Sequence, residues 1–80
     1  MQTYTVRIGL REPSTIMLSQ LDDAMEQKRF LPALRLVDDD GYITYHYHTG
    51  TKNKQQLCAL VYSIAERIQP GPVVLIDEQA

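Results

Sequence analysis

The stretch LRLVDDDGYITYHYH, residues 34–48, contains two runs of alternating side chains separated by three aspartates and a glycine. Asp40-Gly41 favours the positive backbone angles of a two-residue type I′ hairpin turn. Such a turn sets four pairs opposite one another, namely Leu34 with Tyr47, Leu36 with Tyr45, Arg35 with His46, and Ala33 with His48. A slip of one residue would mix the apolar and polar faces. The stretch therefore predicts a β-hairpin whose tyrosines face a core and whose histidines face outward.

The residues before the hairpin predict a strand and a helix. TYTVRIGL, residues 3–10, alternates between apolar and polar side chains, which is typical of a half-buried strand. Apolar residues then recur at helical spacing up to Lys28. This helix is expected to begin either at Pro13 or at Ser19.

The residues after the hairpin predict a second helix and a last strand. Residues 51–69 carry an apolar stripe at helical spacing, made of Leu57, Leu60, Val61, Ile64, Ala65 and Ile68. Thr51 is the expected cap, and Pro70-Gly71-Pro72 stops the helix. VVLI, residues 73–76, predicts a short strand, and residues 77–80 predict a polar tail.

The resulting βαββαβ order matches the split βαβ, ferredoxin-like arrangement. We expect residues 1–80 to form a single α+β domain with one four-stranded antiparallel sheet in the order 4-1-3-2. Both helices would then cover one face of the sheet. The other face would stay open, and function or association is to be sought there or along an edge.

Composition limits the classes of function. The 80 residues include 44% hydrophobic and 22% charged residues, as in an ordinary globular protein. The single cysteine, Cys58, excludes an internal disulfide framework, which fits a reducing compartment. No apolar run approaches the roughly 18 residues of a membrane span, and the amino terminus lacks the order of a signal peptide. We therefore expect a cytoplasmic protein that does not engage a membrane.

The open face is the candidate binding surface. Its expected side chains are Arg7, Arg35, Tyr42, Thr44, His46 and His48. Sheet faces of this fold bind single-stranded RNA in some proteins, but a formal net charge of −2 gives phosphates no general attraction. Two such sheets could also pack together, and a domain of this size buries only about 60% of its unfolded surface. We favour a protein partner over RNA and expect a homodimer.

The histidines, the three aspartates and the cysteine could each carry chemistry, but each also has a structural explanation. His46 and His48 could share a metal ion, but zinc normally takes three or four ligands, and Arg35 is expected opposite His46. The aspartates at 38–40 fit a hairpin turn better than a metal loop. Cys58 lies beside the helical stripe and is expected to be a buried or half-buried thiol. We therefore predict no catalytic residue, no metal and no cofactor.

TYTVRIGL, LSQLDDAMEQKRF and a hairpin built on DDG together resemble small bacterial ferredoxin-like proteins of the GhoS antitoxin type. These are fold relatives of the CRISPR-associated endoribonucleases that have a dimeric ferredoxin-like core. In that family the metal-binding aspartate stands at the end of the first strand, where this chain has Leu10, Arg11 and Glu12. The resemblance implies a dimeric fold and transfers no catalytic residue.

The sequence thus predicts a small non-enzymatic interaction or regulatory module, for example an antitoxin or inhibitor, that binds a macromolecule through its open sheet face or an edge. The alternative is a metal-dependent endoribonuclease that uses Glu12 or the aspartates at 38–40 with His46, which rests on fold analogy.

Overall fold

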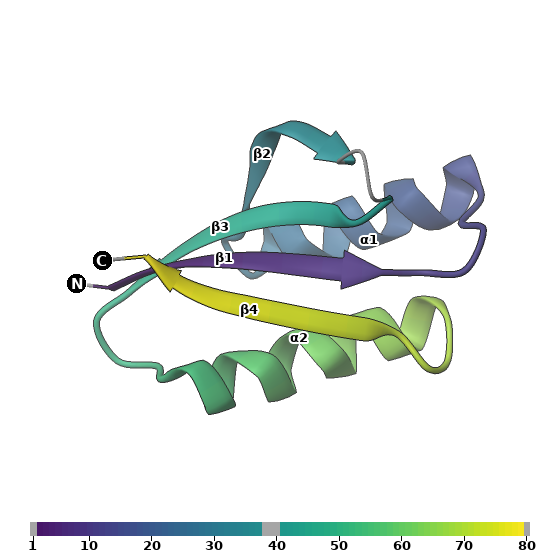
Figure 1. The fold of residues 1–80 in the computed structure, drawn as a ribbon. Coiled ribbons are helices and arrows are strands. Elements are labelled where there is room, and N and C mark those ends of the chain that lie inside the picture. Colours follow the sequence, from purple (N-terminus) through teal and green to yellow (C-terminus); the bar gives the residue numbers. More distant parts are fainter. Residues whose placement is uncertain (1, 38–40, 80) are drawn as a thin grey trace.

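The structure is a computed structural model that describes residues 2–37 and 41–79. Its elements are β1 (Gln2–Gly9), α1 (Thr15–Gln27), β2 (Leu31–Val37), β3 (Ile43–Thr49), α2 (Lys54–Ile68) and β4 (Val73–Gln79). The strands form one antiparallel sheet in the order β2-β3-β1-β4, which reads β4-β1-β3-β2 from the other edge (Figure 1). The protein is therefore an α+β domain with a four-stranded sheet and two helices.

One core lies between the sheet and the helices. α1 and α2 contact each other, α2 contacts β4, and α1 contacts β2. The buried hydrophobic side chains come from both layers: Tyr4, Val6, Ile8, Leu21, Met25, Phe30, Ile43, Tyr45, Leu57, Val61, Ile64, Ala65 and Ile76. The core residues of β1 (Tyr4, Val6 and Ile8) and of β3 (Ile43 and Tyr45) are spaced two apart, as the alternation of side chains along a strand requires. None of the described helices is long and apolar enough to cross a membrane.

The two faces of β3 are as predicted. Tyr45 is fully buried, and Tyr47 stacks on Phe30 with ring centroids 4.4 Å apart. His46 is half-buried and His48 is exposed. The tyrosines therefore face the helices and the histidines face outward, which confirms the orientation of the strand.

The predicted register of the hairpin is wrong. The pairs given by the backbone are Leu31 with His46, Pro32 with Tyr45, and Val37 with Ile43. Arg35 is therefore not opposite His46, and Leu36 is not opposite Tyr45. The physical reason is an irregularity between Pro32 and Val37, where β2 contains more residues than the stretch of β3 that it spans. A proline also cannot donate a ladder hydrogen bond, which suits Pro32 to this edge strand.

The expected turn is only partly described. Gly41 has a φ of +84°, the left-handed conformation that this type of hairpin turn requires and that glycine readily adopts. Asp38, Asp39 and Asp40 lie outside the described residues. The same holds for the side chain of Arg35, so its predicted place on the open face is not described.

Both helix starts differ from the predictions. α1 begins at Thr15, with Ser14 as the cap, because the Ser14 hydroxyl accepts the backbone N–H of Met17 at 3.1 Å. Its predicted end near Lys28 is confirmed, since α1 ends at Gln27 with Lys28 as its C-cap. α2 is capped by Asn53 and not by Thr51: Asn53 and Gln56 each accept the other's backbone N–H in a capping box.

The last strand is longer than predicted. β4 continues through the acidic residues to Gln79, and its register with β1 runs from Gly9 opposite Val73 to Thr3 opposite Gln79. The predicted polar tail over residues 77–80 is therefore wrong up to residue 79. The reason is that β1 offers its backbone over this whole length, and an edge strand tolerates polar side chains.

Candidate functional site: the open sheet face

The face of the sheet that points away from the helices is called the open face here. Its residues form rows across three strands because opposite residues in a sheet point to the same side. The rows from β3 through β1 to β4 are His48, Thr3 and Gln79; His46, Thr5 and Asp77; Thr44, Arg7 and Leu75. A fourth row has Gly9 beside Val73, and Leu31 of β2 lies next to His46.

Threonines of β1 hold both histidines. The Oγ1 atom of Thr3 lies 2.9 Å from Nδ1 of His48. The Oγ1 atom of Thr5 lies 3.5 Å from Nδ1 of His46. In each ring the second nitrogen, Nε2, takes no part in this contact, and a histidine nitrogen can donate or accept depending on its tautomer. The two imidazoles are therefore oriented polar groups on the surface of the central strands.

Tyr42 lies against the backbone of Gly9. A Cβ atom placed on Gly9 would come within 2.8 Å of Cε1 of Tyr42 and 3.4 Å of Cβ of Val73. Every other side chain at this position would therefore displace the tyrosine ring. Tyr42 thereby lies on the open face, as predicted, close to the start of β4.

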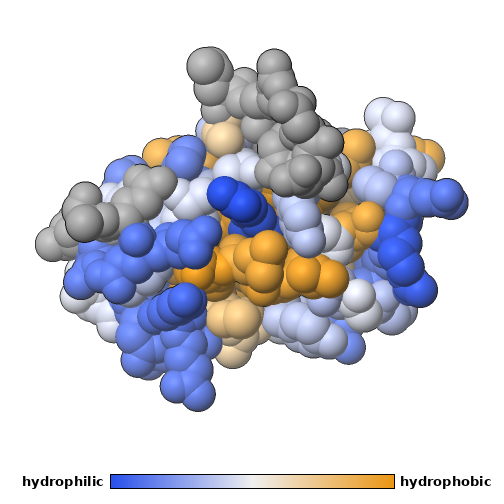
Figure 2. Space-filling view, viewed as in Figure 1, coloured by the Kyte–Doolittle hydropathy of each residue, from blue (hydrophilic) through white to orange (hydrophobic). Residues whose placement is uncertain are grey.

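Exposed aliphatic side chains complete this surface. Val73 is 48% exposed and Leu75 is 42% exposed, and both lie on the open face of β4. Figure 2 shows a hydrophobic area along the front of the molecule, where Figure 1 places β4, with strongly hydrophilic residues around it. At the far edge of the same face Leu31 is 52% exposed. The open face thus combines polar, basic and apolar groups.

A shallow hollow of about 530 Å³ lies at one end of the open face. Its lining includes Gly9, Tyr42, Val73 and the segment of residues 10–13 that follows β1. That segment is held by Gln69: the Arg11 backbone N–H donates to Gln69 Oε1 at 2.6 Å, and Gln69 Nε2 donates to the Arg11 carbonyl at 2.8 Å. These contacts fix the wall of the hollow next to Glu12.

The structure does not bring Glu12 and His46 together. His46 lies opposite Thr5, whereas Glu12 follows the end of β1 at Gly9. The four residue steps from Thr5 to Gly9 alone span about 13 Å. Glu12 and His46 therefore do not form the grouping that a metal-dependent nuclease would need.

Most of the predicted binding residues do lie together. Arg7, Thr44, His46 and His48 occupy adjacent rows of the open face. The prediction missed Val73 and Leu75, because residues 73–76 were interpreted only as a short apolar strand followed by a polar tail. The run VVLI shows no alternation of apolar and polar residues, so it carries no signal for the two faces: only the pairing of β4 with β1 shows that Ile76 is buried and that both neighbours at 75 and 77 are exposed.

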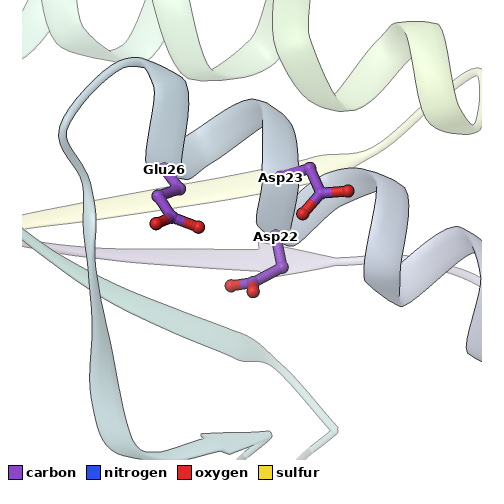
Figure 3. Close-up of side chains that lie close together, drawn as sticks. All are labelled: Asp22, Asp23 and Glu26. Carbon is purple, nitrogen blue, oxygen red and sulfur yellow. The ribbon is translucent and has the colours of Figure 1, made fainter.

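A group of carboxylates on α1 was also missed. Oxygens of Asp22, Asp23 and Glu26 lie within 4.8 Å of one another (Figure 3), the one such grouping of histidine, cysteine or acidic side chains among the described residues. Glu26 follows Asp22 by four residues and Asp23 by three, spacings that make it a neighbour of both on the surface of a helix. The Tyr45 hydroxyl donates to Asp22 Oδ1 at 3.2 Å, so this carboxylate also ties α1 to β3.

Tyr45 is an unusually weak acid in this setting. Burial raises the pKa of its phenol, and the charge of Asp22 and the hydrogen bond to it act in the same direction. The phenol therefore stays protonated well into alkaline solution, and its hydroxyl remains a donor to Asp22.

Comparison of the chain with protein-family models, with curated proteins and with solved structures found no match.

Proposed function

We propose that the protein is a non-enzymatic interaction module that binds a macromolecular partner through its open face. The observation that carries this proposal is the exposure of Leu31, Val73 and Leu75 on a sheet face that neither helix covers. Exposed apolar groups that are framed by polar ones mark interaction surfaces in monomeric proteins. Arg7 and the two histidines supply that frame.

A protein partner suits this surface better than RNA. The open face carries the carboxylate of Asp77 in the row of Thr5 and His46, and the whole chain has a formal net charge of −2. Nucleic-acid surfaces draw most of their affinity from clustered basic residues. Mixed arginine, histidine and aliphatic side chains are instead what protein interfaces contain. An antitoxin or small inhibitor, whose task is to cover another protein, is the biological role that we propose.

The assignment of the fold class is part of the same proposal. We assign the chain to the ferredoxin-like class, supported by the βαββαβ order and by a sheet whose central strands are β1 and β3. In this class the helices occupy one face, so the second face is available to partners.

The test uses two variants with equal change in charge. Arg7→Glu/His46→Glu alters the open face, and Gln55→Glu/Arg67→Glu alters exposed positions of α2. Each replaces one arginine and one neutral residue by glutamates, so effects of net charge are matched. Both are first checked by urea unfolding, so that only folded variants are compared.

The measurement is affinity capture from source cells, with and without nuclease treatment, followed by quantitative mass spectrometry. We expect one protein partner to be retained by the wild type and by the α2 variant, to survive the nuclease, and to be lost by the open-face variant. Equal capture by both variants would contradict the proposal. A partner that disappears with nuclease would favour RNA.

A further inference from the structure

The two outer edges of the sheet are built differently. At the β2 edge, Pro32 removes a backbone donor, and the pairing with β3 is irregular between Pro32 and Val37. Prolines and bulges are the devices that keep an exposed edge from pairing with another chain. β4 has neither proline nor lysine, and its register with β1 is unbroken from Val73 to Gln79. No described strand pairs with the outer side of β4, and its charged residues, Asp77 and Glu78, lie only in its last part, so residues 73–76 form the less protected edge.

Apolar side chains flank this edge on both sides. Val73 and Leu75 lie on the open face, and Val74 and Ile76 point to the other side of the strand. On that side a groove of about 370 Å³ separates β4 from α2 and is lined by Lys54, Cys58, Val74, Leu75, Ile76 and Asp77. Over residues 73–76 the edge is therefore both open and flanked by apolar side chains on each side of the strand.

The next turn of α2 carries an exposed tyrosine. Tyr62 is four residues after Cys58, so it lies on the same side of the helix as Lys54 and Cys58. Its side chain is 40% exposed. Exposed aromatic rings are common anchors of protein contacts.

We propose that a second copy of this chain pairs with β4, antiparallel and edge to edge, to form a continuous eight-stranded sheet. One register of β4 with itself is free of opposed charges: with Leu75 at the twofold axis, Val74 lies opposite Ile76 in an apolar pair, and Asp77 lies opposite uncharged Val73. Glu78 then lies beside uncharged Pro72. A register centred on Asp77 would instead place carboxylates against each other, which is unfavourable.

The assembly closes at two copies. A twofold contact uses the same edge of both subunits, so after pairing only the two β2 edges remain at the ends of the sheet. These edges are the ones with the proline and the irregular pairing. The twofold axis runs perpendicular to the sheet, so both open faces lie on the same side of the dimer. This proposal goes beyond the proposed function. In the dimer the two open faces would together present one larger binding surface.

The first test is sedimentation of the full chain at concentrations up to about 100 µM, a range in which even a weak dimer is populated. We expect a dimer, and we expect Leu75→Lys to weaken it by a factor of roughly ten or more, since two cations would meet at the axis. Arg7→Glu/His46→Glu should remain dimeric, so failure of this proposal and failure of the proposed function can be told apart.

The second test measures the register by disulfide formation under oxidised glutathione. In a Cys58→Ser background, Leu75→Cys places a thiol opposite its own copy, whereas Val73→Cys faces Asp77 of the other copy. We expect a covalent dimer from the first variant and at least about tenfold slower formation from the second. A monomeric wild type, a dimer unaffected by Leu75→Lys, or equal crosslinking of both variants would each overturn the proposal. So would a monomer that instead captures an added extended peptide along β4.

Discussion

At the scale of single residues, Tyr45 shows how a polar group is accommodated in the core. Its ring is fully buried between the sheet and the helices, and its hydroxyl donates to Asp22 on α1. The alternation of β3 predicts that Tyr45 points inward, but it does not predict the partner. Asp22 lies on another element 23 residues away in the chain, and only the packing of α1 on the sheet brings the two together.

Tyr45→Phe should change how stability depends on pH. The pKa of Tyr45 is raised in the folded protein, whereas an unfolded tyrosine ionises near pH 10. Above about pH 10 the unfolded chain therefore loses this proton first, and the free energy of unfolding falls. The phenylalanine variant has no ionisable phenol at this position. Its unfolding free energy, measured by urea titration between about pH 8 and 11, should therefore fall less steeply as the pH rises. Parallel curves for the two proteins would refute the role of Tyr45.

At the scale of elements, the helix caps show what local patterns can and cannot decide. Both Thr51 and Asn53 are cap-forming residue types, and the apolar stripe does not distinguish between them. The structure places Thr51 in a turn, where its backbone N–H donates to the Thr49 hydroxyl at 3.1 Å. The pattern that identifies the true cap is Asn53 with Gln56 three residues later. A search for capping boxes would have found it.

Asn53→Ala and Thr51→Ala separate these alternatives. Loss of the Asn53 amide leaves the N–H of Gln56 without its acceptor and should cost about 1 kcal/mol of unfolding free energy. Thr51→Ala retains the backbone contact to Thr49 and should cost less than about 0.5 kcal/mol. Urea denaturation at neutral pH would measure both losses of unfolding free energy. A larger loss from the threonine variant would restore Thr51 as the cap.

At the scale of the whole molecule, the orientation of the hairpin could be predicted although its register could not. The predicted partner of Tyr45 was Leu36, and the observed partner is Pro32, a slip of four residues along β2. The slip is even at Leu31 and Pro32, which keeps both on the faces expected from alternation, whereas at Ile43 the backbone partner is residue 37 in place of the expected 38, an odd slip. The binary pattern of β3 therefore identified core and open face correctly, whereas the exact pairing depended on an irregularity near Pro32 that no local pattern predicts.

The candidate site could likewise be predicted only in part. Arg7, Thr44, His46 and His48 could be placed on one surface from alternation alone. Val73 and Leu75 of β4 could not be placed on this surface from alternation. Their exposure follows only once β4 is known to be an edge strand that pairs with β1 over its whole length.

The most direct test compares two substitutions on opposite sides of the sheet. Leu57 is fully buried against the core face, and His46 lies on the open face. Urea unfolding should show that Leu57→Ala loses roughly 2–5 kcal/mol. His46→Ala should lose less than about 1 kcal/mol, because it removes one partly exposed contact to Thr5. A histidine variant that proves as damaging as the leucine variant would mean that the open face is not open, and the proposed interaction surface would be withdrawn.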